Sequence, residues 1–487
     1  MIQSKAITIL KQLNKKEFIQ FGKYLSSGAF TPNKKLFKLY NFLKKHYPHF
    51  SSAEISKQSI YKSSYNNPKY DDASTRKILS DFYKETELFL AMLRLRNDKP
   101  TLQKTVLPEL DERKLDTLFP FKYEEIKGKL LVPPHQLSDF LDIHLLEWSN
   151  LSFHLIRGMQ DKMGPHVYSR LENIIFYTLC DTFLGLQDIL TYKNSYNFSK
   201  PVNLPQAFVS SIDHKKLFKY IQDNEFLGKE IVLSFYLAYL ANKNFDDNSY
   251  YFRLKEFVLK NFENYHISTQ RTMAAFMTNY CIRKRRQSEK EFDHELSEVY
   301  QLHIKYKLIR INKEKYIRTD VFLNMLTYYY EVGKISELGS FIEANIESIQ
   351  PGHRKNTISL CQALMEFEQG NFELSLRQVS MIKSTTFVFK HKIKILILKN
   401  HFELKNYETA RDLANSFYKS TTMSKNVLEL QKQRIYKFLS YFNLLIKASE
   451  NKPEKNKLSE ISGSKKENQF LESVWILKKI DKLLKNS

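Results

Sequence analysis

The chain has 487 residues, of which 42% are hydrophobic and 26% charged, and its formal net charge is +23. This composition supports a large folded core and excludes global disorder. Only 12 Gly and 13 Pro are present, which favours long helices with short connections and disfavours nucleotide enzymes, because phosphate-binding loops need glycine. The three cysteines, Cys180, Cys281 and Cys361, lack zinc-ligand spacing and are expected to be buried thiols in a reducing compartment.

Residues 1–70 form a lysine-rich region that holds 13 Lys and two Glu. Phe18, Phe21 and Leu25 follow the i, i+3, i+7 spacing of a helix face that packs into a core. We therefore expect the aromatic residues to be buried and the lysines to form the outer face. Lysines of such a face can contact a phosphate backbone in a salt-dependent way. The candidate residues for these contacts are Lys34, Lys35, Lys44 and Lys45.

The same region carries a family resemblance. Leu13-Asn14-Lys15-Lys16-Glu17-Phe18, Asn33-Lys34-Lys35-Leu36 and Leu79-Ser80-Asp81-Phe82 resemble the opening of a family of uncharacterised bacterial helical-repeat proteins. The resemblance implies a helical-repeat architecture and implies no activity.

Two long amphipathic helices are predicted next. The helix over Asp71–Asn97 begins with aspartates that can cap its free N–H groups. The helix over Ser138–Gly158 carries an apolar face formed by Leu141, Leu145, Trp148 and Leu155. On this helix His144, Glu147 and His154 could hold a metal ion, but a local hydrogen bond on a half-exposed face explains the spacing better. No strand is predicted anywhere in the chain.

From about residue 215 the pattern becomes a repeat. Gly370-Asn371-Phe372-Glu373 separates two apolar helices, and Lys405-Asn406-Tyr407-Glu408 follows 35 residues later. Gly333-Lys334-Ile335 lies 37 residues before Gly370. The pattern resembles the tetratricopeptide repeat, with Ala363 and Ser375, matched by Ala410, at the positions where two helices touch. The resemblance implies stacked helical hairpins, since one hairpin alone cannot bury both of its apolar faces.

The chain is predicted to end in a capping helix, a linker and one more helix. Ser424–Ser449 carries an apolar stripe and would cap the stack. The next segment has no apolar period and is typical of a flexible linker. The final helix has a stripe that includes Ile480 and Leu484, and it is expected to pack back on the repeats or on a partner.

Catalytic and cofactor motifs are missing from the sequence. No G-x-G, G-x-x-x-x-G-K or G-x-S-x-G pattern occurs. His294-Glu295-Leu296-Ser297-Glu298 starts like a zinc-protease helix but has Glu298 in place of the second His, so a solvated helix face is expected there. Arg283-Lys284-Arg285-Arg286 is the one tight basic cluster. It could neutralise a helix C-terminus or form an anion-binding patch, since arginine pairs bidentately with oxyanions.

We therefore predict an all-α protein with an N-terminal helical domain followed by an α-solenoid of tetratricopeptide-like helical hairpins. The predicted parts are a basic helical domain over 1–100, a helical connecting region over 101–210, the solenoid over 211–448, a flexible linker over 449–468 and a C-terminal helix over 469–487.

The favoured function is a non-enzymatic scaffold or adaptor that binds an acidic partner protein or peptide on the helical-repeat surface. Its candidate contacts are Arg283, Lys284, Arg285 and Arg286. Nucleic-acid or ribonucleoprotein binding through the lysine-rich N-terminal region is the alternative, and an enzyme whose site is assembled from distant residues is a third possibility. No cofactor, metal ion or catalytic residue is predicted. The longest apolar stretch, Ile231–Ala241, is about half a membrane span, so we expect a cytoplasmic protein without a membrane span.

Overall fold

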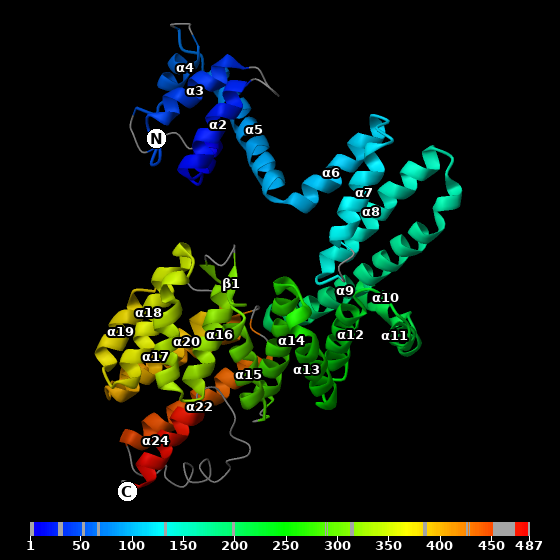
Figure 1. Cartoon of the computed structure of the whole chain (residues 1–487). Helices are drawn as coiled ribbons and strands as arrows, with labels where there is room; N and C mark the ends of the chain where they lie inside the picture. Colours follow the sequence, from blue (N-terminus) through cyan, green and yellow to red (C-terminus); the bar gives the residue numbers. More distant parts are fainter. Residues whose placement is uncertain are drawn as a thin grey trace. The chain divides into compact units, whose positions relative to one another are not determined.

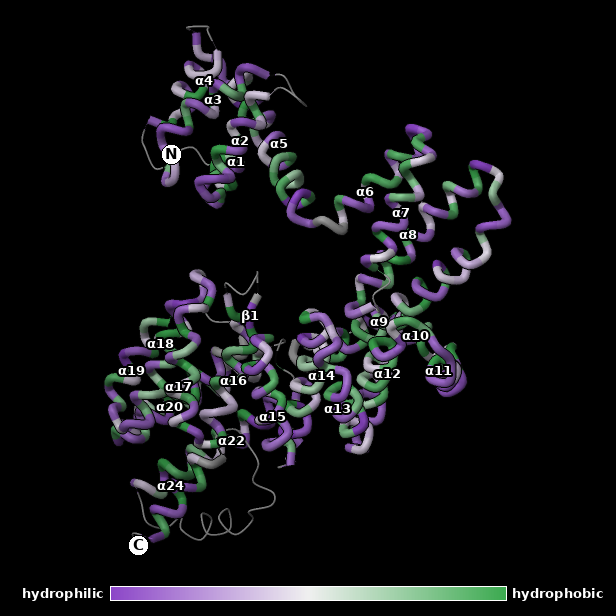
Figure 2. Tube along the Cα trace, in the orientation of Figure 1, coloured by the Kyte–Doolittle hydropathy of each residue, from purple (hydrophilic) through white to green (hydrophobic). Residues whose placement is uncertain are grey.

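A computed structural model describes most of the chain. The described residues are 4–27, 33–50, 54–65, 69–130, 134–196, 200–287, 289, 291–311, 316–382, 387–424, 427, 429–450 and 473–485. The chain folds into two compact units, unit 1 (Met1–Leu131 and Leu145–Val167) and unit 2 (Val132–His144 and Tyr168–Ser487). The described residues are almost entirely helical (Figure 1), which confirms the predicted all-α class. In Figure 2 hydrophobic and hydrophilic residues alternate along most helices, as amphipathic helices require.

The elements of unit 1 are α1 (Lys5–Leu10), α2 (Lys15–Ser27), α3 (Lys34–Lys44), α4 (Lys57–Ser64), α5 (Asp72–Asn97), α6 (Lys99–Glu112), α7 (Leu118–Leu130) and the 3-10 turn η1 (Gln160–Lys162). Helices α8 (Leu137–Ile156) and α9 (Gly164–Tyr196) have residues in both units.

The remaining elements belong to unit 2. They are α10 (Leu204–Ser210), α11 (His214–Asp223), α12 (Lys229–Lys243), α13 (Ser249–Asn261), η2 (Phe262–Asn264), α14 (Ile267–Arg286), α15 (Glu291–Lys305), β1 (Arg310–Ile311), β2 (Tyr316–Ile317), α16 (Thr319–Glu331), α17 (Ile335–Asn345), η3 (Ile346–Ser348), α18 (Pro351–Glu368), α19 (Phe372–Ser380), α20 (Phe387–Glu403), α21 (Tyr407–Met423), α22 (Glu429–Glu450) and α24 (Ser473–Lys485).

The predicted core of the lysine-rich region is confirmed. Phe18, Phe21 and Leu25 of α2 are buried in one cluster that also contains Phe82 of α5. Helix α5 begins as the sequence predicts, because the Asp71 carboxylate accepts hydrogen bonds from the N–H groups of the helix's first turn. Phe18 and Phe21 thus hold α2 against α5 and are not available for stacking on bases.

The predicted apolar face of α8 is wrong in its C-terminal part. Leu145, Trp148 and Leu155 are 47%, 56% and 57% exposed. Unit 1 instead buries Leu146 and Phe153 against helices α6 and α7. Both faces of α8 carry apolar residues, so periodicity alone selected the wrong one.

In unit 2, helices that follow one another in the chain pack in pairs. The pairs are α12 with α13, α14 with α15, α16 with α17 and α18 with α19. The turns at Gly333, Gly370 and Lys405 all have left-handed backbone, with φ of +73°, +83° and +60°. Each turn closes with an N–H···O=C bond of 2.9 Å that spans six residues, such as Asn371 N to Glu366 O. Turns placed 37 and 35 residues apart therefore share one geometry.

The residues predicted to let two helices touch are buried at that contact. Ala363, Ser375 and Ala410 are each 0% exposed. The Ser375 hydroxyl donates to the Ala363 carbonyl oxygen at 2.7 Å. A larger side chain at Ala363 or Ser375 would separate α18 from α19.

One short element of unit 2 differs from the sequence prediction, and one helix bears on the predicted lack of a membrane span without testing it. Strands β1 and β2 form a short antiparallel ladder between α15 and α16, where no strand was expected. Residues Gly164–Lys193 of α9 are long and apolar enough to cross a membrane by length and composition. The core helix of a soluble protein passes the same test, so the predicted lack of a membrane span stays a prediction.

The C-terminal elements follow the predicted order. Helix α22 buries Ile435, Leu439 and Phe442, as its stripe predicts. The predicted linker lies outside the described residues from residue 451 onward. Helix α24 packs on α22 through Ile476 and Ile480, both fully buried.

Candidate functional site

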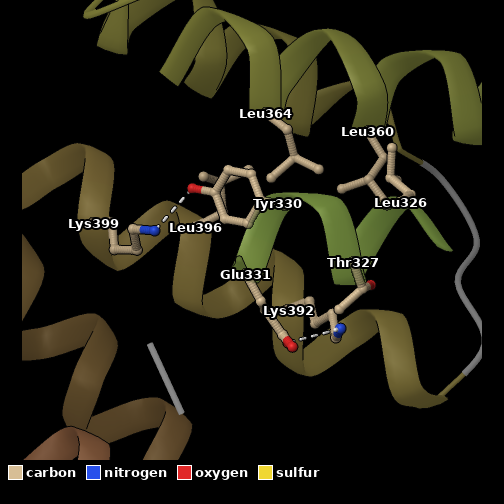
Figure 3. Close-up of a pocket in the computed structure, with 9 residues that line it drawn as sticks. All are labelled: Leu326, Thr327, Tyr330, Glu331, Leu360, Leu364, Lys392, Leu396 and Lys399. Carbon is tan, nitrogen blue, oxygen red and sulfur yellow. Dashed lines mark hydrogen bonds and ion pairs between the residues drawn. The ribbon is translucent and has the colours of Figure 1, made fainter. Parts of the chain in front are cut away.

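A small pocket lies between α16, α18 and α20 in unit 2 (Figure 3), and its volume is about 30 Å³. It is lined by Leu326, Thr327, Tyr330, Glu331, Leu360, Leu364, Lys392, Leu396 and Lys399. Leucines from all three helices form an apolar wall, and two lysines of α20 lie opposite Tyr330 and Glu331 of α16. The volume holds about two water molecules. The pocket therefore suits the tip of one side chain and cannot enclose a substrate.

Lys399 brings a buried positive charge to this pocket. The residue is 2% exposed, and its Nζ donates a 2.9 Å hydrogen bond to the Tyr330 hydroxyl. The same Nζ lies 4.5 Å from the ring centroid of Phe367 and 5.5 Å from that of Trp475. Ring faces attract a cation, and the attraction grows when water is excluded. Trp475 belongs to α24, so the docked C-terminal helix forms one wall around the Lys399 ammonium.

Glu331 is the acidic group of the pocket, and cations approach it from other helices. Lys392 Nζ lies 3.6 Å from one carboxylate oxygen, and Arg285 Nη2 lies 3.5 Å from the other. Arg285 also forms an ion pair with Asp293. Burial lowers the pKa of Arg434, while Glu331 raises it and Arg285 lowers it, so Arg434 belongs to the same electrostatic group.

Among the described residues, the cations of this group outnumber its carboxylates. The cations are Arg285, Lys392, Lys399 and Arg434, and the carboxylates are Glu331 and Asp293. The Nε of Arg434 is buried and has no hydrogen-bond partner among the described residues. An acidic ligand group could accept a hydrogen bond from such a donor.

The basic cluster predicted at 283–286 is not one surface patch. Lys284 is 2% exposed, forms a 2.9 Å ion pair with Glu289 and lies over the ring of Phe245. Arg283 donates to Asn242 at 2.7 Å, and Arg285 reaches the rim of the pocket through Glu331. The side chain of Arg286 lies outside the described residues. Lys284 therefore stabilises its hairpin from within and is not accessible to a partner.

The N-terminal lysines are placed in unit 1. Lys34, Lys35, Lys44 and Lys45 are all exposed at the two ends of α3. Lys35 lies 4.4 Å over the ring of Tyr65, and no ion pair of the other three is found among the described residues. They form a basic surface without exposed aromatic neighbours on the same helix.

The His294 motif proves less exposed than predicted. His294, Glu295 and Glu298 bring possible ligand atoms within 4.8 Å of one another. Glu295 is buried, which corrects the expectation of a fully solvated face. Lys255 Nζ lies 2.6 Å from Glu295 and also pairs with Glu298. The lysine ammonium thus supplies the positive charge that these carboxylates need.

His144 and Glu147 of α8 have hydrogen-bond partners on other helices, whereas the buried Nδ1 of His154 has none among the described residues. His144 Nδ1 lies 3.0 Å from the Arg170 carbonyl oxygen. Glu147 is 2% exposed and contacts His166 Nδ1 at 2.6 Å and the Tyr123 hydroxyl at 3.1 Å. The interpretation as a local hydrogen bond on a half-exposed face is therefore wrong, because His144 and Glu147 bond to residues of α7 and α9 and Glu147 is buried.

Sequence reasoning missed the lysines of α20. Lys399 directly follows a nearly continuous apolar run, Ile393-Lys394-Ile395-Leu396-Ile397-Leu398. Lys392 lies seven residues before Lys399 and therefore on the same side of the helix. A lysine inside a run predicted to be buried is the signal that could have found the site.

Comparison of the chain with protein-family models, with curated proteins and with solved structures finds no match.

Proposed function

We propose that this protein is a non-enzymatic scaffold or adaptor that binds an acidic protein or peptide on a tetratricopeptide-like α-solenoid formed by the hairpins of unit 2. The shared geometry of the turns at Gly333, Gly370 and Lys405 supports the repeat. The paired packing of consecutive helices supports the stacking. The resemblance of the N-terminal region to bacterial helical-repeat proteins is consistent with this architecture, and we propose the cytoplasm as its location.

The single observation that carries the proposal is the leucine-lined pocket with cations from several helices around it. Helices α16, α18 and α20 are the first helices of three consecutive hairpins, so a segment lying across them would contact all three. An aliphatic side chain of the partner would fill the leucine-lined wall. A neighbouring carboxylate would meet Lys392 and Arg285 at the rim. The net charge of +23 would speed the encounter with an acidic partner.

A capture experiment with matched variants tests this function. The tagged full chain is used to recover partners from the native cell, with and without nuclease. Lys392→Glu reverses one charge at the pocket, and Lys419→Glu makes the same change on the exposed surface of α21. We expect the partner to persist after nuclease, to be lost with Lys392→Glu and to be kept with Lys419→Glu. Equal recovery with both variants would contradict the proposal.

Nucleic-acid binding through unit 1 is the second candidate, because Lys34, Lys35, Lys44 and Lys45 are exposed together. Phosphate contacts of this kind weaken steeply as salt rises. The test is a filter-binding titration with single-stranded RNA at about 50 and 200 mM salt. The quadruple Lys→Glu variant should abolish binding. Failure of the wild-type chain to bind at the lower salt would exclude this function.

A further inference from the structure

A second and larger cavity lies in unit 2 between α9, α10, α12 and α14, and its volume is about 280 Å³. This is close to the lower end of small-molecule sites, about 300–1,000 Å³. This cavity shares no lining residue with the pocket of the proposed function. Helices α9, α12 and α14, whose residues line this cavity, are labelled in Figure 1.

The wall of the cavity is apolar on one side and cationic at its rim. Phe183, Leu186 and Phe276 contribute apolar surface, and Phe183 and Phe276 are themselves 2% and 4% exposed. Lys193 and Lys243 also line the cavity, and both are exposed. Among the described residues that line it there is no Asp or Glu. The cavity therefore attracts anions at its rim and accepts an apolar body inside.

Two amide side chains that line this cavity, Asn242 and Gln187, have a fixed orientation. Arg283 Nη1 donates to Asn242 Oδ1 at 2.7 Å, and Asn242 Nδ2 donates to Gln187 Oε1 at 2.5 Å. Arginine has donors and no acceptor, so the Asn242 oxygen must face Arg283 and the Asn242 nitrogen must face the Gln187 oxygen. Because the first donor is a guanidinium, the positions of the oxygen and nitrogen atoms are fixed in both amide groups, Asn242 and Gln187.

Gln187 consequently presents its NH₂ group to the cavity. Gln187 is 6% exposed and lines the cavity, and its Nε2 donates no hydrogen bond among the described residues. A ligand that accepts this hydrogen bond takes the place of water at the Gln187 NH₂ group and gains affinity where its acceptor is charged. Hydrogen bonds in a chain strengthen one another, and the charge on Arg283 makes the Gln187 NH₂ a better donor to an anion.

We propose that this cavity binds an organic carboxylate with an apolar body. The carboxylate oxygen accepts the hydrogen bond of the Gln187 NH₂ and faces the ammonium groups of Lys193 and Lys243. The body lies against Phe183 and Phe276. Such a carboxylate could belong to a free organic acid or to the C-terminus of a peptide, because both present the same group beside an apolar residue.

Calorimetric titration of the full chain tests the proposal with four probes. Phenylacetate and the peptide Gly-Gly-Phe carry the carboxylate, while phenylacetamide and Gly-Gly-Phe-amide are their neutral counterparts. We expect at least one acid to bind about tenfold more tightly than its amide, as expected for a charge-assisted hydrogen bond. Binding of phenylacetate alone would indicate a free acid as ligand, and binding of the peptide alone would indicate a chain end.

Matched variants locate the site. Gln187→Glu keeps an oxygen for Asn242 but places a negative charge where the NH₂ was, and it should abolish binding of the acids. Gln301→Glu makes the same change on the exposed surface of α15 and should leave binding unaltered. Lys243→Gln at the exposed rim should weaken binding about tenfold without affecting folding, so the proposal stays testable if Gln187→Glu fails to fold. Equal binding of acids and amides, no binding at millimolar concentration, or unchanged binding in Lys243→Gln would overturn the proposal.

Discussion

One carboxylate links helix α24 to α20, and removing it gives the sharpest prediction about the C-terminal region. Glu403 of α20 accepts a 3.0 Å hydrogen bond from Trp475 Nε1 and forms a 2.6 Å ion pair with Lys479 Nζ. Both partners belong to α24. The side chains of Glu403 and Lys479 are 12% and 20% exposed. Glu403→Ala removes both contacts and leaves the ammonium without its counter-charge.

The expected cost follows from these contacts. Losing a hydrogen bond to a charged group costs about 1.5–3 kcal/mol, and breaking a fully buried ion pair costs about 3–5 kcal/mol. Because the pair keeps some contact with water, we expect about 2–3 kcal/mol for Glu403→Ala. The loss falls on the docking of α24, while Ile476 and Ile480 still hold it to α22.

Amide hydrogen exchange of α24 measures this loss directly. A cost of 2–3 kcal/mol should speed exchange there by about 30- to 160-fold. Fluorescence gives a second readout, because the chain has two tryptophans and Trp148→Phe leaves Trp475 as the only one. In this background, Glu403→Ala should shift the fluorescence of Trp475 towards that of an exposed tryptophan. Glu368→Ala, at an exposed position of α18, is the control. Unchanged exchange in α24 would refute the reasoning.

Three further predictions concern stability and reactivity. Burial lowers the pKa of His303 to about 4 in the folded chain. The unfolded histidine has a pKa of about 6.5 and therefore binds the proton more readily. The free energy of unfolding should consequently fall by up to about 3 kcal/mol between pH 6.5 and 4. His303→Gln should flatten that slope in urea titrations, and an equal slope would contradict the argument. Ala410→Leu should lower stability by about 1–3 kcal/mol through overpacking, visible as a lower urea midpoint. Burial raises the pKa of Cys281 and Cys361 to about 12, so a thiol reagent such as dithionitrobenzoate should modify them only after unfolding; rapid modification of the folded chain would argue otherwise.

Local signals explain why helix ends were predictable. Asp71 caps α5, and the turn at Gly370 needs a left-handed backbone that glycine adopts without strain. The equivalent turn at Lys405 has the same conformation in a lysine, so it was found by its spacing from Gly370 and not by its residue type. Such features depend on a few neighbouring residues, which a single sequence displays.

Features that depend on distant partners could not be predicted. The exposed side of α8 carries Trp148, which is as apolar as the residues that the helix buries. Lys284 was predicted to be on the surface because its neighbours are basic, yet Glu289 and three aromatic rings enclose it. The cations around Glu331 come from α14, α20 and α22, and no spacing within one helix shows that they meet. The side chains of these residues are positioned by tertiary packing.

The proposed function can be measured most directly by fluorescence anisotropy of the full chain with a labelled peptide rich in Glu and Leu. The account predicts saturable binding that weakens at least tenfold in Lys392→Glu and is unchanged in Lys419→Glu, although the two variants have the same net charge. Equal weakening in both would mean that only the overall charge attracts the peptide. That result, or a complete lack of binding, would contradict the claim that the pocket between α16, α18 and α20 receives an acidic partner.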